Sequence, residues 1–186
     1  MMRVLSIVML IALVSCIQKS NRNKNAEKKY KSVMNEVSGK TLVLPEGLRF
    51  SYLNKGDSCS IKAMPKKIYS YVDASCGSCI ANIDGWDQFL DEYCHLEVSV
   101  VIVCISDDNF ALFEYLIEQK RAIMNKNIIF LYDQQKKWLT SNPFMIKYDQ
   151  LRVVLTDSDD RILLLGNPIN NKKLMESYIG MIKGGA

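Results

Sequence analysis

The chain has 186 residues, of which 48% are hydrophobic and 24% are charged, both close to the averages for globular proteins. This composition excludes a disordered chain, a collagen-like chain and a coiled coil, and the length suits one domain with a small extension. The net charge of +4 is local: residues 17–40 carry +5 and Arg3 adds one, so residues 41–186 carry −2. We therefore expect no nucleic-acid surface on the folded part.

The first sixteen residues have the features of an export signal. Arg3 gives a positively charged start, and Val4 to Val14 are apolar apart from one serine. This run is too short to span a bilayer but has the length of a signal-peptide core. It ends at Ser15-Cys16, which resembles the bacterial lipobox, and the resemblance implies that Cys16 is lipidated and begins the mature chain. The alternative is an ordinary signal peptide with a chance cysteine.

We therefore expect a signal peptide at residues 1–15, a lipidated cysteine with a polar tether at 16–39 and a folded domain at 40–186. A short surface helix is predicted at 28–37. The basic tether could contact anionic lipid, but a solvated spacer is the simpler interpretation. No acidic residue follows Cys16, so the usual inner-membrane retention signal is missing. We expect a cell-envelope lipoprotein that faces the periplasm from the outer membrane.

The hydrophobic pattern of the remaining chain predicts alternating strands and helices. It first predicts an N-terminal hairpin, made of residues 41–44 and 48–53 around Pro45-Glu46-Gly47. In chain order, the patterns then predict a strand at 67–73, a helix from about 76 to 93, a strand at 98–105, a helix from 109 to about 124, a strand at 127–132, a short helix within 134–144, strands at 151–155 and 161–165, and a helix at 171–183.

This order predicts an α/β fold with a central mixed sheet and helices on both faces. The nearly unbroken β-branched run at 98–105 is typical of a strand buried on both faces. The turn-forming Asp157-Ser158-Asp159-Asp160 predicts that the last two strands pair antiparallel. A tight turn explains these acidic residues more simply than calcium, since the rest of a calcium-loop pattern is missing.

The motif that carries chemistry is Cys76-Gly77-Ser78-Cys79, directly after a predicted strand and at the start of an amphipathic helix. Two intervening residues in a first helical turn bring two sulfurs within disulfide distance. The partial positive charge of a helix N-terminus favours a thiolate there. We therefore expect Cys76 to be the more exposed nucleophile and Cys79 the resolving thiol.

Other uses of such a pair fit the sequence less well. Zinc sites usually need a second pair or added histidines, and the only histidine is His95. A haem attachment needs histidine directly after the second cysteine, where Ile80 stands. We therefore expect no metal and no cofactor. A purely structural disulfide is the remaining alternative, and the strand-before, helix-after context favours redox activity over it.

The order of strand, C-x-x-C, helix, strand, helix, strand, β-hairpin and closing helix resembles the thioredoxin fold over about residues 41–183. The unit around 127–133 resembles the membrane-anchored TlpA-like thiol–disulfide oxidoreductases. More narrowly, Tyr71-Val72-Asp73, Trp86 and Gly166-Asn167-Pro168 resemble thioredoxin-like lipoproteins of anaerobic Gram-negative bacteria. The resemblance implies reduction of a client protein's disulfide, with an upstream protein as electron donor.

Two positions depart from that family. Ser75 stands where thioredoxins usually carry an aromatic residue, and Leu151 stands where they carry a cis-proline. In the family the cis-proline shapes the client groove and keeps metal away from the thiols, so its replacement bears on the efficiency of exchange. Gly77 and Ser78 do not by themselves define a redox potential. Asp73 could influence the thiol protons, although a strand-end Asp is more often a turn or cap residue.

The other chemistry-bearing residues have simpler interpretations. Cys104, Cys94 and Trp86 are expected in the core, and His95 on the surface. Cys59 is expected in a polar loop, with a regulatory or client-linking role as the less favoured alternative.

Two other functions compete with exchange. One is a redox-silent thioredoxin-like binding module of the cell envelope. The other is peroxide reduction, which is disfavoured because no Pro and Thr precede Cys76 in the peroxidase pattern.

Overall fold

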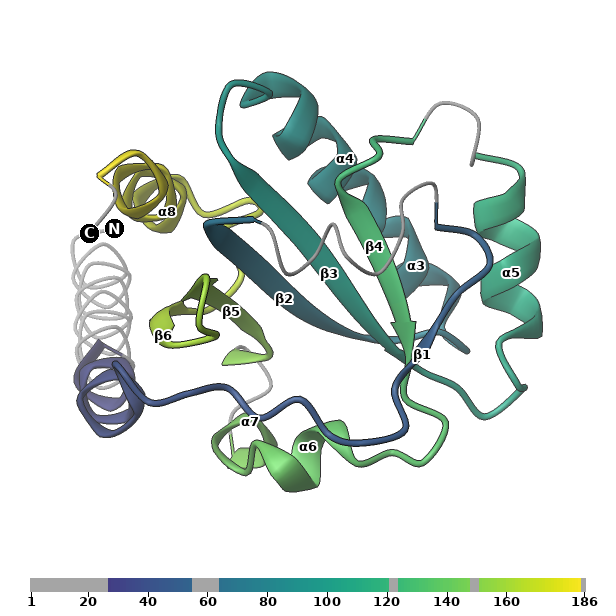
Figure 1. The fold of residues 1–186 in the computed structure, drawn as a ribbon, viewed down its shortest axis with the longest axis horizontal. Coiled ribbons are helices and arrows are strands. Elements are labelled where there is room, and N and C mark those ends of the chain that lie inside the picture. The colour runs from purple at the N-terminus through teal and green to yellow at the C-terminus, as the bar shows by residue number, and fades with distance from the viewer. Residues whose placement is uncertain (1–26, 55–63, 121–123, 148–150, 185–186) are drawn as a thin grey trace, which may run out of the picture. The chain divides into compact units, whose positions relative to one another are not determined.

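The computed structural model describes residues 27–54, 64–120, 124–147 and 151–184 (Figure 1). It divides into two units, residues 1–37 and 38–186, which are described separately. In the first unit, residues 27–37 form a helix, which confirms the helix predicted at 28–37. Glu27 and Lys31 form an exposed ion pair of 2.9 Å one turn apart on this helix.

The second unit is built on a mixed sheet that has six strands among the described residues, in the order β1-β4-β3-β2-β5-β6 (Figure 1). The three central strands β4, β3 and β2 are parallel, and β1 and β5 join them antiparallel, while β6 pairs antiparallel with β5. The mixed sheet and the antiparallel last pair were predicted from the sequence and are confirmed. The strands are β1 (Arg49–Phe50), β2 (Lys66–Asp73), β3 (Val98–Ile105), β4 (Ile128–Tyr132), β5 (Val153–Asp157) and β6 (Ile162–Leu165).

Helices cover both faces of the sheet. They are α3 (Gly77–Ala81), α4 (Ile83–Glu92), α5 (Ala111–Glu118), α6 (Trp138–Ser141), α7 (Phe144–Lys147) and α8 (Lys172–Lys183). The apolar sides of α4, α5 and α8 pack with alternate residues of β3 in one core; its members include Trp86, Phe113, Tyr178, Val100 and Ile102. On β2, Ile68 belongs to this core, whereas the ring of the next residue, Tyr69, packs at a tilt against Trp138 of α6 with ring centroids 5.6 Å apart. Successive strand residues point to opposite faces, so α6 lies across the sheet from α4.

The predicted N-terminal hairpin is wrong. Thr41 forms a bridge with Arg161, next to β6, whereas Arg49–Phe50 pairs with β4 at the opposite edge of the sheet. Between them the backbone of Val43 is held by a side chain: its N–H donates to Asn142 Oδ1 at 3.0 Å and its carbonyl accepts from Asn142 Nδ2 at 2.9 Å. The segment therefore passes α6 and α7 on its way from one sheet edge to the other (Figure 1), and its two halves never meet.

Two predicted helices are shorter than expected. The helix expected at about 76–93 is divided at Asn82 into α3 and α4. The helix expected from 109 to about 124 is Ala111–Glu118. It begins late because Asn109 and Phe110 before it have φ angles of 56° and 67°. These angles lie in the left-handed region, which does not continue a right-handed helix.

A buried ion pair ties β2 to the β5–β6 turn. Lys67 Nζ lies 2.7 Å from Asp160 Oδ1, and only 3% of the lysine side chain is exposed. Tyr69 donates its hydroxyl hydrogen to the same carboxylate oxygen at 2.7 Å, and Lys67 Nζ also donates to the Ser158 carbonyl at 3.0 Å. Burial, followed by the charge of Asp160, raises the pKa of Tyr69. The pair lies at the start of β2, whereas the cysteine motif follows its end.

Candidate redox site

Cys76 is the residue that caps the N-terminus of α3. Its backbone is extended, with φ −109° and ψ 107°, and its Sγ accepts a hydrogen bond from the Cys79 N–H at 3.3 Å. Cys76 and Cys79 form a disulfide with their Cα atoms 5.2 Å apart, within the usual range. The spacing and the helix start therefore bring the two sulfurs together, as the sequence predicts.

The pair is accessible from solvent. Gly77 and Ser78 are exposed, and both cysteines are half-buried. The greater exposure of Cys76 stays a prediction. The Ser78 hydroxyl lies 3.2 Å from Cys76 Sγ, within hydrogen-bond distance. When the pair is reduced, the Cys79 N–H and the helix N-terminus are positioned to stabilise a thiolate on Cys76.

Asp73 acts as a turn residue between β2 and the motif. Its Oδ1 accepts from the Ser75 N–H at 2.9 Å, and its carbonyl accepts from the Cys76 N–H at 3.3 Å. Ala74, between them, is fully buried, and its N–H continues the pairing with β3 by donating to the Ile105 carbonyl at 2.7 Å. The turn interpretation of Asp73 therefore accounts for its contacts.

Ser75 connects the cysteine motif to the loop that follows β3. Its Oγ accepts from the Asp107 N–H at 2.7 Å and lies 3.4 Å from Ser106 Oγ. Sequence reasoning did not single out Ser106 or Asp107. The sequence does contain a feature that could have identified them. Both residues directly follow β3, which is parallel to β2, and the carboxyl ends of parallel strands lie at the same edge of a sheet.

Leu151 lies beside β2 just before the motif. The β2–β5 register pairs Ser70 with Val153, and the Tyr71 N–H donates to the Arg152 carbonyl at 3.1 Å. The same register continued by two residues places Leu151 opposite Val72, four residues before Cys76. Leu151 is buried, and the described residues contain no cis peptide bond. A buried leucine therefore lies at the position that corresponds to the cis-proline of the family that the sequence resembles.

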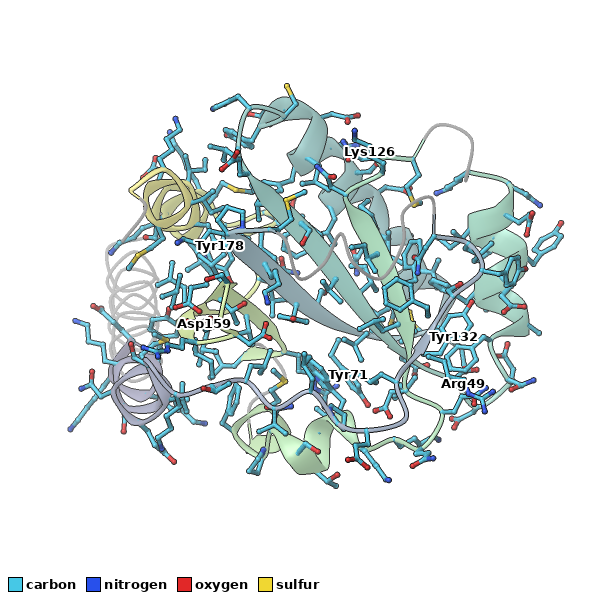
Figure 2. All side chains as sticks on the ribbon, in the orientation of Figure 1. Arg49, Tyr71, Lys126, Tyr132, Asp159 and Tyr178 are labelled. Carbon is cyan, nitrogen blue, oxygen red and sulfur yellow. A yellow bond between two sulfur atoms is a disulfide. The ribbon has the colours of Figure 1, made fainter. Side chains whose placement is uncertain are left out.

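Charged groups surround the end of β2. The guanidinium of Arg152 lies 5.8 Å from the centroid of the Tyr71 ring (Tyr71 is labelled in Figure 2). Burial, followed by the charge of Asp133, raises the pKa of Tyr71 to about 12, so this phenol is neutral at physiological pH. Lys136, after β4, forms an ion pair with Asp107, and this hydrogen bond raises the pKa of Lys136.

The remaining cysteines divide by exposure. Cys104 is buried within β3 as predicted, and burial raises the pKa of its thiol. The prediction for Cys94 is wrong: it is exposed, because α4 ends at Glu92 and Cys94 lies in the following turn. Cys16 and Cys59 lie outside the described residues.

The other singled-out residues behave as expected. Trp86 is buried in the core and His95 is exposed. Asp157 Oδ1 accepts from the Asp159 and Arg161 N–H groups, both at 2.9 Å, which is the tight turn predicted for this segment. Within the described ranges, no group of three or more His, Cys, Asp or Glu side chains is placed to hold a metal ion. Helices in the same ranges are all too short or too polar to cross a membrane.

Comparison with solved structures shows what this architecture is. No family model and no curated protein matches the sequence. A proposed thiol:disulfide interchange protein DsbE from Chlorobium tepidum superposes with a TM-score of 0.51 at 13% identity, covering 77% of this chain and 96% of that one. An uncharacterized thioredoxin-like protein from Porphyromonas gingivalis gives 0.52 at 14% identity, covering 78% and 95%. The chain has a thioredoxin-like fold.

The thioredoxin-like fold confirms the main structural expectation drawn from the sequence. A proposed thiol–disulfide oxidoreductase from Bacteroides vulgatus is also similar, with a TM-score of 0.51 at 12% identity, covering 72% of this chain and 94% of that one. In this chain the fold places a C-x-x-C pair at the end of a central parallel strand and at a helix start. The fold and the pair together support thiol–disulfide exchange in general terms.

Proposed function

We propose that this chain carries out thiol–disulfide exchange on client proteins outside the cytoplasm, through Cys76 and Cys79. The observation that carries the proposal is the position of Cys76 at the N-cap of α3, where its Sγ accepts from the Cys79 N–H and is partly open to solvent. A purely structural disulfide gains nothing from this placement, whereas a nucleophilic thiol gains a stabilised thiolate.

The exchange proceeds in two displacements. The Cys76 thiolate attacks one sulfur of a client disulfide, which forms a mixed disulfide and releases the other client sulfur as a thiolate. The Cys79 thiolate then attacks Cys76 Sγ, so the Cys76–Cys79 disulfide forms and the second client thiolate leaves. Two electrons pass to the client. A dithiol donor protein must return two electrons to the pair before the next cycle.

A redox-silent binding module is the second candidate. The observation that favours it is Leu151, whose buried side chain occupies the cis-proline position beside the motif. On this alternative the Cys76–Cys79 disulfide is permanent, and the surface around it binds a partner without electron transfer.

A glutathione titration of the full chain distinguishes the two candidates. We expect Cys76 and Cys79 to interconvert reversibly between dithiol and disulfide as the ratio of reduced to oxidised glutathione changes. Thiol trapping with mass spectrometry reports the state of each cysteine, and the exposed Cys94 serves as an internal reference for labelling. A pair that stays oxidised at every ratio would contradict exchange and support the binding module.

We further propose that residues 1–15 are a signal peptide and that Cys16 anchors the chain to the envelope, through a tether at 16–39. The supporting features are the apolar run of the leader and Ser15 directly before Cys16. The domain at 40–186 then faces the periplasm, on the outer membrane, and meets its clients and its electron donor there.

Metabolic labelling with radioactive palmitate in a bacterial host tests the anchor. We expect label on the wild-type chain and none on Cys16→Ala, which should also keep its leader and run as a larger band. Cys94→Ala is the control and should be labelled like wild type. Equal label on Cys16→Ala would overturn the lipidation, and membrane fractionation of the labelled protein tests the outer-membrane placement.

A further inference from the structure

The loop between β3 and α5 is organised by one hydroxyl group. Ser106 Oγ accepts hydrogen bonds from two backbone groups, the Asp108 N–H at 3.0 Å and the Phe110 N–H at 2.8 Å. Its own hydroxyl hydrogen is donated to Asp108 Oδ1. This bond, followed by one from the Leu112 N–H, lowers the pKa of Asp108, so the acceptor is a carboxylate at neutral pH.

This loop has an unusual backbone. Asn109 and Phe110 both have positive φ, which is rare for a bulky residue such as phenylalanine. Phe110 is nonetheless buried, and its ring stacks on Tyr132 of β4 with centroids 4.0 Å apart and an interplanar angle of 8° (Tyr132 is labelled in Figure 2). The bonds to Ser106 and the stacking of Phe110 therefore keep the loop in one conformation.

That conformation presents the Asp107 N–H to Ser75. The Ser75 hydroxyl accepts from it at 2.7 Å, and the Ser75 N–H is in turn bound by Asp73 Oδ1 at 2.9 Å. Ser106 gives its only hydrogen to Asp108 and accepts from the Asp108 and Phe110 N–H groups, so its hydrogen-bonding positions are all occupied, and the 3.4 Å approach of the two hydroxyls is a packing contact. Ser75 is thus held at its backbone and its side chain, one residue before Cys76.

We propose that Ser75 and Ser106 are positioning residues for Cys76: through the β3–α5 loop they hold it in the N-cap geometry in which its Sγ accepts from Cys79. The proposal rests on the proposed function, because positioning matters only for a thiol that reacts. It gives a role to Ser75, the position where the chain departs from the aromatic residue usual in thioredoxins. If the hydrogen bond between Ser75 and the β3–α5 loop is lost, Cys76 is no longer held where its Sγ accepts from the Cys79 N–H. The thiolate form of Cys76 is then less favoured.

The first measurement is the rate at which iodoacetamide alkylates Cys76, followed against pH. It uses the full chain with Cys79→Ser and Cys94→Ser, so that Cys76 is free and the exposed Cys94 does not compete, and mass spectrometry of the Cys76 peptide separates its alkylation from that of Cys16 and Cys59. We expect Ser106→Ala and Ser75→Ala each to shift the alkylation profile to higher pH and to lower the rate at pH 7 by three- to tenfold. Their combination should do no more than either alone, since both belong to one network.

The second measurement is the glutathione equilibrium of the pair with Cys79 intact. A less favoured thiolate destabilises the reduced form, so Ser106→Ala should shift the equilibrium three- to tenfold towards the disulfide. Ser106→Thr keeps the hydroxyl and should restore most of the wild-type value. Ser177→Ala is the matched control, because that hydroxyl is exposed and donates to the Lys173 carbonyl within α8.

The outcomes distinguish the positioning role of the two serines from the proposed thiol–disulfide exchange. If Ser106→Ala and Ser75→Ala lower the melting temperature but leave both the alkylation profile and the glutathione equilibrium unchanged, the serines only stabilise the loop and the positioning role is overturned. If the wild-type pair fails to exchange with glutathione, the proposed function fails. The alkylation profile still decides the positioning of Cys76 in that case, because it needs no exchange.

Discussion

Replacing Cys76 with serine is expected to abolish disulfide reduction, while replacing Cys79 with serine should stop turnover after one mixed disulfide has formed. The reason is the division of roles at the start of α3. Only Cys76 occupies the N-cap, where its sulfur accepts from a backbone N–H, so it makes the first attack. Cys79 is needed to release the client from Cys76.

Insulin reduction followed by turbidity measures the first effect, and non-reducing electrophoresis of protein mixed with insulin measures the second. Cys76→Ser should fall to the rate without protein and trap no client, and Cys79→Ser should accumulate a covalent complex. Cys94→Ser, at an exposed cysteine away from the motif in sequence, should behave as wild type. Equal trapping by the Cys76→Ser and Cys79→Ser variants would show that the roles are not divided as the N-cap geometry predicts.

The largest effect on stability is expected at the ion pair between Lys67 and Asp160. Asp160→Asn should lower the free energy of unfolding by about 3 kcal/mol, because it leaves a lysine ammonium buried without its carboxylate. Asparagine is the suitable replacement, since Asp160 has a φ of 60° and asparagine tolerates that conformation. Urea unfolding followed by circular dichroism measures the change.

Two further variants identify the cause of that loss. Adding Lys67→Met to Asp160→Asn removes the unpaired charge and should recover most of the lost stability. Asp84→Asn breaks the pair between Lys120 and Asp84, whose side chains are 44% and 47% exposed, and should cost less than about 1 kcal/mol. If Asp160→Asn costs no more than Asp84→Asn, burial of the Lys67 pair contributes nothing to stability.

The glutathione equilibrium should be unchanged in Asp160→Asn. Lys67 is at the start of β2 and Cys76 follows its end, and the six residue steps from Lys67 to Asp73 alone span about 20 Å of extended strand, at roughly 3.3 Å per residue. A loss of stability without a change in redox behaviour would show that the two ends of β2 have separate roles.

The central sheet could be predicted because its signals are local. The β-branched residues of β3 are buried on both faces, as an uninterrupted apolar run predicts. The cysteine pair could be placed for a similar reason, since a strand end, two cysteines and a helix start lie within a few residues of each other. Asp157 could be assigned to a turn because its partners, Asp159 and Arg161, are also nearby in sequence.

The errors arose where distant residues decide the outcome. Gly47 does adopt the positive φ of a turn, but the segments on either side of it do not pair with each other. Thr41 pairs with Arg161, and Phe50 pairs with Leu131. Cys94 was expected in the core because the apolar spacing of α4 extends to Tyr93. In the structure Tyr93 leaves the helical conformation, so Cys94 turns outward.

The role of Ser106 could not be predicted from its own surroundings in the sequence. It depends on two adjacent left-handed residues and on Ser75, which is 31 residues away along the chain. Hydrogen bonds between loops at the end of a sheet leave no periodic pattern, so they become visible only when the strands have been placed.

The segment that crosses the sheet also constrains the order in which the chain can fold. Leu42 donates to the Asp160 carbonyl at 2.7 Å, and the Gly39 N–H donates to the Ile162 carbonyl at 2.9 Å. The beginning of the domain is therefore bonded to the last two strands and their turn, and these contacts cannot form until more than a hundred further residues have emerged from the ribosome. Contacts of such long sequence separation close late and slow folding. A chain synthesised from its N-terminus therefore keeps residues 39–42 without these partners until Asp160 and Ile162 have been made, and an unpaired segment is open to misassembly during that interval.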